Sequence, residues 1–197
     1  MADQPRPSKR THDPRVLRAL AHPVRNRILD ELSASGPLRA ADVAADLGIP
    51  ANQASFHLRS LAKYGLVEED PDAARDRRDR VWRLTQQEGW SIDLGEVEKA
   101  PGGKAAATVF RHQRAAQAHA VVDEAFNDRR EPDVHRTVID GALRLTKQEA
   151  AEFSEELSAL LHAWNERTRG RDPRRRTYSV LQIVQPTQDV TSEDRDR

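Results

Sequence analysis

The sequence predicts an α+β fold that is mainly helical. Three observations support this class. Apolar residues recur at helical spacing through residues 13–64 and again in the segment after Thr146. Two short apolar stretches follow the first helical region, as expected for a pair of strands. Glycine and proline lie between these segments, where they end helices or form turns.

The chain has 197 residues, a formal net charge of zero and a hydrophobic content of 37%. It contains no cysteine, which excludes disulfides and thiolate metal sites. No apolar run is long enough to cross a membrane, and the polar N-terminus does not resemble a signal peptide. We therefore expect a cytoplasmic protein with no membrane partner. Residues 1–12 and 186–197 are predicted to form a disordered arm and a disordered tail.

The first two predicted helices are short and punctuated by proline. Asp13 and Pro14 have the N-cap and first-turn positions of the first helix. Pro23 begins a second helix, which Gly36 ends. A third helix is predicted over residues 40–47.

A fourth helix is predicted from Pro50 to about Tyr64, separated from the third by a turn at Gly48. Two helices at this spacing are typical of a helix-turn-helix. Residues 66–69 and 80–84 are predicted strands, with Trp82 and Leu84 on one face and Val81 and Arg83 on the other. A β-ribbon in this position makes a winged helix-turn-helix domain over residues 13–90.

The fourth helix has one apolar face and one face that could bind DNA. Ala54, Leu58 and Leu61 share the buried side at 3.6 residues per turn. The candidate DNA-contacting residues of this helix are Asn52, Gln53, Ser55, Phe56, His57, Arg59 and Lys63. Amide, hydroxyl and cationic groups can reach base edges and phosphates in the major groove.

These residues have different expected roles. Asn52 and Gln53 suit adenine, and Phe56 suits the methyl group of thymine. Arg59 and Lys63 suit phosphates. His57 has two open interpretations, because it can contact DNA or pack beneath the helix with a backbone hydrogen bond.

The loop between the two strands is the candidate wing. Its basic residues are Arg75, Arg77 and Arg78, interspersed with aspartates, and Arg80 follows at the start of the next strand as a further candidate. Arginine on a wing can enter the minor groove or bind the DNA backbone. The alternative is a solvated turn in which the mixed charges cancel.

The rest of the chain is predicted to support assembly. Residues 91–103 are a connector, and residues 104–127 form a long alanine-rich helix spanning about 36 Å, suited to dimerisation. Residues 128–185 form a small α/β unit, with strands at 137–145 and 177–184 on either side of a helix. Because two strands make a poor sheet, we expect pairing with residues 91–97 or with a second subunit.

The C-terminal helix is predicted to begin at a capping box of Thr146 and Glu149. Its apolar stripe is predicted to be core and consists of Phe153, Leu157, Leu160, Leu161 and Trp164. Because a DNA reader does not need this unit, it is the expected place for a small-molecule effector pocket.

The stretches AHPVRNRILDEL, ADVAADLGIPANQASFHLRSLAKYGLVEED and RVWRLT resemble the ArsR family of bacterial winged-helix repressors. Regulators of the MarR and PadR types share the same fold and stay open as alternatives. The resemblance covers about residues 13–87. It implies a homodimer that represses transcription from double-stranded DNA and is released by an effector.

The metal sites of that family are not matched here. The third helix has no cysteine, and the spacing of His112, His119 and Asp123 departs from the family's dimer-helix pattern. We expect no metal and no other cofactor. The sequence also has no motif of a catalytic site, so we expect no enzyme activity. The competing function is a winged-helix module that binds protein rather than DNA.

Overall fold

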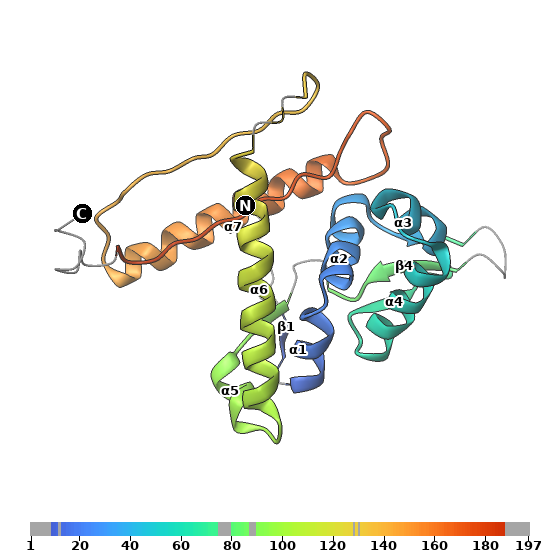
Figure 1. The fold of residues 1–197 in the computed structure, drawn as a ribbon, viewed down its shortest axis with the longest axis horizontal. Helices are drawn as coiled ribbons and strands as arrows, with labels where there is room; N and C mark the ends of the chain where they lie inside the picture. The colour runs from blue at the N-terminus through green and yellow to red at the C-terminus, as the bar shows by residue number, and fades with distance from the viewer. Residues whose placement is uncertain are drawn as a thin grey trace, which may run out of the picture.

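The computed structural model has a winged helix-turn-helix at one end and a long helical arm at the other (Figure 1). It describes residues 9–11, 13–74, 80–86, 90–127, 129 and 131–187. The helices are α1 Pro14–Leu20, α2 Pro23–Ser35, α3 Ala40–Leu47, α4 Ala51–Lys63, α5 Leu94–Lys99, α6 Gly103–Ala125 and α7 Lys147–Thr168. The strands are β1 Lys9–Thr11, β2 Leu38–Arg39, β3 Val67–Glu69, β4 Val81–Leu84 and β5 Trp90–Ile92.

Local signals place the first four helices where the sequence predicts them. The Asp13 carboxylate accepts a hydrogen bond of 2.8 Å from the Arg15 amide at the start of α1. Gly36 ends α2. Gly48 follows α3 with φ 63° and ψ 36°, a left-handed conformation that costs glycine little. The fold class, mainly α with a winged helix-turn-helix, is therefore confirmed.

The wing strands belong to a three-stranded antiparallel sheet with the order β2-β4-β3. β2 is a two-residue strand too short for sequence periodicity to indicate, and it pairs Leu38 with Trp82. Along β4, Val81 is buried as well as Trp82 and Leu84, so the face that Val81 shares with Arg83 is also partly covered. Only Arg83 of this central strand is exposed.

The helices and strands of the winged helix pack around one hydrophobic core. Its largest fully buried side chains come from α2, α3, α4, β2, β3 and the loop before β3, and are Ile28, Leu32, Leu38, Val43, Leu58, Leu61, Leu66 and Val67. Full burial of a side chain of this size contributes about 1.5–3 kcal/mol. This core fixes α4 against α3 and leaves the opposite side of α4 uncovered.

A second, smaller cluster attaches α6 to the winged helix. It consists of Leu17 of α1, Val97 of α5, and Ala106 and Ala107 of α6. The connector predicted over residues 91–103 contains a short helix that the sequence did not indicate, α5, which is capped by the Asp93 side chain. The long helix is close to its prediction and spans about 34 Å.

The N-terminal segment is not wholly a disordered arm. Residues 9–11 form β1, which pairs in parallel with β5. The disorder prediction is wrong for these three residues, since backbone pairing with a strand some eighty residues away orders them. The rest of that arm, residues 1–8 and 12, and most of the predicted C-terminal tail, 188–197, lie outside the described residues.

The C-terminal unit differs most from its prediction. α7 begins at the predicted capping box, in which the Thr146 amide donates to Glu149 at 2.7 Å. The strands expected at 137–145 and 177–184 are absent, and both of these described segments are extended without strand pairing. No residue of α7 is buried, so its apolar stripe is not a core within one chain. The described part of the chain covers this stripe only partly, at Phe153 and Leu157. Among the described residues, no helix is long and apolar enough to span a bilayer.

Candidate nucleic-acid interface

The outward face of α4 is accessible. Phe56 is 58% exposed, and Asn52, Arg59 and Lys63 are exposed beside it. Gln53 and Ser55 are half-buried at the edge of this face. An exposed aromatic ring among polar side chains on one helix face can make an apolar contact with another molecule while its neighbours make polar ones. Six of the seven candidate residues on this helix therefore lie where a partner can reach them.

The polar groups on this face have unused hydrogen-bonding capacity. In the described part of the chain, the side chains of Gln53, Ser55, Arg59 and Lys63 make no hydrogen bond or ion pair. Asn52 uses one oxygen lone pair to accept from the Gln53 amide at 2.9 Å, which leaves its two N–H donors available. Both amides and both cations can therefore bind an external partner without breaking an internal contact.

His57 lies on the inner side of α4. It is 4% exposed, and its ring centroid lies 4.6 Å from that of His22 and 5.4 Å from that of Phe56. This burial favours the packing interpretation of His57 and leaves its side chain little surface for a DNA contact. The expected backbone hydrogen bond is absent, however, because Nδ1 has no partner among the described residues.

Electrostatics in this buried contact disfavour protonation. Burial lowers the pKa of His57, and the neighbouring His22 and Arg25 lower it further. Burial and Arg25 likewise lower the pKa of His22. Both imidazoles are therefore held in the neutral form beneath the outward face of α4. Sequence reasoning missed His22 and Arg25 because they come from α2 and its N-cap, far from α4 in the chain.

The candidate wing is only partly described. Arg75, Arg77 and Arg78 lie outside the described residues. Arg80 is exposed and forms an ion pair of 3.4 Å with Glu69 on the neighbouring strand β3. Arg83 pairs in the same way with Glu68 at 2.9 Å. These pairs fix the base of the β-ribbon.

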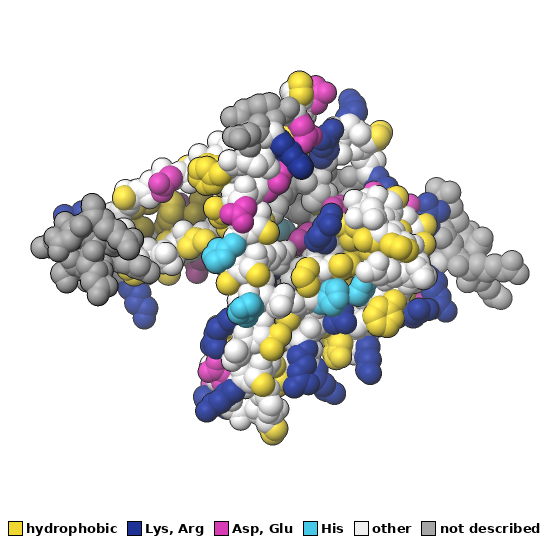
Figure 2. Space-filling view, in the orientation of Figure 1, with side chains coloured by type: hydrophobic (Ala, Val, Ile, Leu, Met, Phe, Trp, Pro, Cys, Tyr) yellow, Lys and Arg dark blue, Asp and Glu magenta, His cyan; other side chains and the backbone are white. Residues whose placement is uncertain are grey.

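Positive charge is concentrated near α4 although the whole chain is neutral. Figure 2 shows Lys and Arg side chains gathered along the edge formed by α1 and α4, with few Asp or Glu side chains between them. Arg15 and Arg18 of α1 are two further basic residues of this region that sequence reasoning did not include. Arg15 is paired with Asp13 at 2.9 Å, whereas Arg18 has no ion pair within the described chain.

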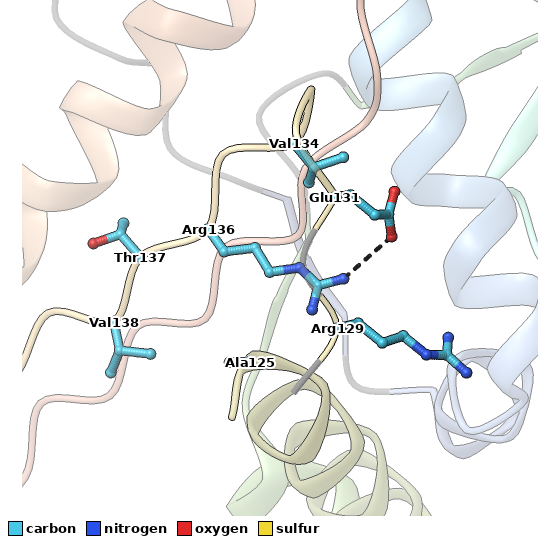
Figure 3. Close-up of a pocket in the computed structure, with 7 residues that line it drawn as sticks. All are labelled: Ala125, Arg129, Glu131, Val134, Arg136, Thr137 and Val138. Atoms are coloured by element: carbon cyan, nitrogen blue, oxygen red, sulfur yellow. Dashed lines mark ion pairs between the residues drawn. The ribbon is translucent and has the colours of Figure 1, made fainter. Parts of the chain in front are cut away.

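The candidate effector site is separate from this face. A hollow of about 310 Å³ lies where α6 meets the following segment, and it is lined by Ala125, Arg129, Glu131, Val134, Arg136, Thr137 and Val138 (Figure 3). The Arg136 side chain is already bound to Glu124 at 3.0 Å and to Glu131 at 3.6 Å. The hollow is therefore polar and internally paired, and effector binding there stays a prediction. Among the described residues, no three acidic or histidine side chains are placed to hold a metal ion.

Comparison with known proteins finds solved structures and one sequence family that are similar to parts of the chain. Solved structures with similarity include YusO from Bacillus subtilis, at 14% identity over 77% of this chain and 82% of that one, with a TM-score of 0.34. A fragment of Mb0332 from Mycobacterium bovis, described as a homodimeric winged helix-turn-helix DNA-binding domain and a possible ArsR-family regulator, has 24% identity over 59% and 83%, with a TM-score of 0.30. Tm0710 from Thermotoga maritima, described as a transcriptional regulator, has 16% identity over 77% and 82%, with a TM-score of 0.32.

These TM-scores are too low to support an argument about the fold, which rests on the helices and strands of this chain. No curated protein sequence matches the chain. One sequence family, described as a helix-turn-helix domain, matches residues 20–70. This range includes α2, α3, α4 and β3.

Proposed function

We propose that this protein is a transcriptional regulator that binds double-stranded DNA as a homodimer and represses its target. α4 would lie in the major groove, with Asn52 and Gln53 at adenine edges and Phe56 against a thymine methyl group. Arg59 and Lys63 would bind phosphates. The observation that carries the proposal is the exposed Phe56 among unused polar groups on the outward side of a helix-turn-helix.

The wing and the C-terminal unit have supporting roles in this proposal. Arg75, Arg77, Arg78 and Arg80 would reach the minor groove or the backbone beside the α4 site. The long helix α6 would join two copies, so that their recognition helices meet two half-sites of a palindrome. A small-molecule effector bound at the C-terminal unit would set the affinity for DNA. The protein would act in the cytoplasm, as in the ArsR-type repressors that its sequence resembles.

The test begins with selection of bound duplexes from a random library, followed by footprinting. Gln53→Ala and Phe56→Ala should each weaken binding to the selected site by about 1–3 kcal/mol and alter which bases are tolerated. Their effect on random DNA should be small, because nonspecific binding depends mainly on phosphate contacts. Affinity is measured by titration of labelled duplexes at fixed salt.

Two matched controls remove the same groups far from α4. Gln148→Ala removes an exposed amide from α7, and Phe126→Ala removes an aromatic ring that is 70% exposed after α6. Both should leave base preference unchanged. Equal losses on specific and random DNA in the α4 variants would refute direct readout. The absence of any binding at low ionic strength would instead favour the protein-binding alternative, which the neutral charge of the chain keeps open.

A further inference from the structure

The C-terminal unit exposes a large apolar surface that one chain does not cover. Figure 2 shows hydrophobic side chains along the arm formed by α7 and its two flanking segments. Ile139 is 90% exposed, Leu143 is 63% exposed and Trp164 is 50% exposed. The other exposed members are Val138, Leu145, Leu160, Leu161, Tyr178, Val180, Leu181, Ile183 and Val184. A patch of this kind indicates an interaction surface.

The backbone around this surface has the order of an unfinished β-α-β unit. The segments 137–145 and 177–184 run in the same direction, antiparallel to α7 (Figure 1). They begin close together, because the His135 amide donates to the Tyr178 hydroxyl at 3.3 Å and Arg176 pairs with Glu131 at 3.4 Å. Neither of these described segments has strand pairing. Two parallel segments with open faces and open edges need further strands before they make a stable sheet.

The rest of the chain has little to complete this unit. The five described strands already pair within the two sheets at the other end of the molecule. The contacts of α7 with the winged helix include polar ones, such as Asn165 Nδ2 to the Ser33 carbonyl at 3.2 Å. The sequence from 188 onward is QDVTSEDRDR, with a single hydrophobic residue, so it is poorly suited to cover an apolar face. A partner molecule is therefore a better source of the missing strands than the described part of this chain.

The segment 137–145 is complementary to itself. When two copies are paired antiparallel about Ala142, Asp140 of each lies opposite Arg144 of the other, and Ile139 lies opposite Leu145. Alternation places Ile139, Leu143 and Leu145 on one face and the charged pairs on the other face. In the single chain, neither Asp140 nor Arg144 has a hydrogen bond or ion pair with any described residue. Opposite charges directly across a strand pair stabilise it, and like charges destabilise it.

We infer that the partner is a second copy of this chain, joined through segment 137–145 across a two-fold axis at Ala142. The two β-α-β units then form one four-stranded sheet, with the 137–145 segments in the centre and the 177–184 segments outside. The apolar face of that sheet is covered by the two α7 helices. Such an isologous contact is self-complementary and closed, so it gives a dimer and not a filament. It rests on the homodimer of the proposed function and adds a second contact beside the one proposed for α6, and it is tested without DNA.

The charge pairs provide the test, using the full chain and sedimentation equilibrium. Asp140→Arg alone or Arg144→Asp alone places like charges opposite each other twice, and each should weaken the dimer about tenfold or more. The double variant Asp140→Arg with Arg144→Asp exchanges the pairs and should restore the dimer. A mixture of the two single variants should form heterodimers. Both positions are exposed, so the circular dichroism and melting temperature of the winged helix should not change.

Cross-linking gives an independent measurement, because the chain has no cysteine of its own. Ala142→Cys should form a disulfide-linked dimer under mild oxidation, since opposed residues of an antiparallel pair have Cβ atoms about 4.5–5.5 Å apart. Ala45→Cys, which is exposed on α3, is the matched control and should stay monomeric on a non-reducing gel. A monomeric wild type, or a dimer indifferent to both charge reversals and linked no better at 142 than at 45, overturns the inference. Loss of DNA binding alone leaves these readouts unchanged and bears only on the proposed function.

Discussion

Two histidines in contact connect the interior of the winged helix with its candidate DNA-binding face. His57 belongs to α4, and the His22 ring 4.6 Å away precedes α2. The cationic Arg25 lies near both rings, and its Nε atom is buried without a partner among the described residues. Protonation of either imidazole would place positive charges together in a poorly solvated space. This contact therefore requires neutral rings.

The stability of the protein should fall as the pH is lowered through this contact. The pKa values of His22 and His57 are below 6.5 in the folded state, whereas in the unfolded chain they are near 6.5. Below about pH 6.5 the unfolded state takes up protons first, so the free energy of unfolding decreases until the folded pKa values are passed. Above about pH 6.5 both histidines are neutral in either state, so their contribution to the free energy of unfolding does not change with pH. Melting temperatures measured from about pH 8 to about pH 5 should show this decline.

The matched variants separate this effect from general acid sensitivity. His57→Gln should flatten the decline, although it lowers stability at all pH values by leaving a buried amide. His112→Gln, at an exposed position of α6, should keep the wild-type profile. An identical slope in wild type and His57→Gln would show that the contact between His22 and His57 does not cause the decline in this pH range.

For single residues, the sequence predicts exposure better than it predicts partners. Helical spacing alone places Phe56, Arg59 and Lys63 on the outward side of α4, and the structure has them exposed. The same spacing puts His57 near the boundary between faces, where either interpretation is open. The contact with His22 decides between them, and a contact between residues so far apart in the chain has no local signal.

Among the elements, α5 shows why short helices escape sequence patterns. It has six residues and one buried side chain, Val97, which is too few for a periodic signal. The pair Gly102-Gly103 suggests a break, and Gly102 does adopt φ 73°. Gly103, in contrast, begins α6 without a positive φ. It is glycine because the backbone carbonyl of Val97 occupies the space of a Cβ atom.

Gly103→Ala should therefore destabilise the protein by about 1–3 kcal/mol, because the added methyl group forces α5 away from α6. Denaturant unfolding measures the change. Lys104→Ala, at the exposed neighbouring position of α6, is the control and should unfold as the wild type does. If both variants unfold at the same denaturant concentration as the wild type, the close approach of α5 and α6 is not required.

The wing gives a second prediction at the scale of elements. Arg77→Ala combined with Arg78→Ala should weaken binding to all duplexes alike, because the wing is proposed to contact phosphates and the minor groove. The slope of log affinity against log salt should also become shallower, by about one for each phosphate that the variant no longer neutralises. Affinity titrations at several salt concentrations measure both quantities. An unchanged slope would remove the wing from the contact surface and favour the solvated-turn interpretation.

For the whole molecule, sequence patterns succeed where an element packs on its near neighbours and fail where it packs on something distant. The winged helix is predictable because the stripes of α2, α3 and α4 cover one another and lie close together in the chain. The stripe of α7 and the alternation of residues 137–145 are equally clear, and neither is buried. A periodic pattern identifies the apolar face, but it does not identify the chain that covers it.

The junction between the arm and the winged helix includes several polar contacts. Arg171 binds Asp42 at 2.9 Å and Asp46 at 3.2 Å on α3, and Thr177 donates to Glu31 at 2.8 Å. Exposed ion pairs of this kind are worth about 0–1 kcal/mol each and can be exchanged at little cost. If two C-terminal arms are joined in a dimer, each winged helix can still change its orientation at this junction. The regulator would then tolerate operators whose two halves are separated by different lengths of DNA.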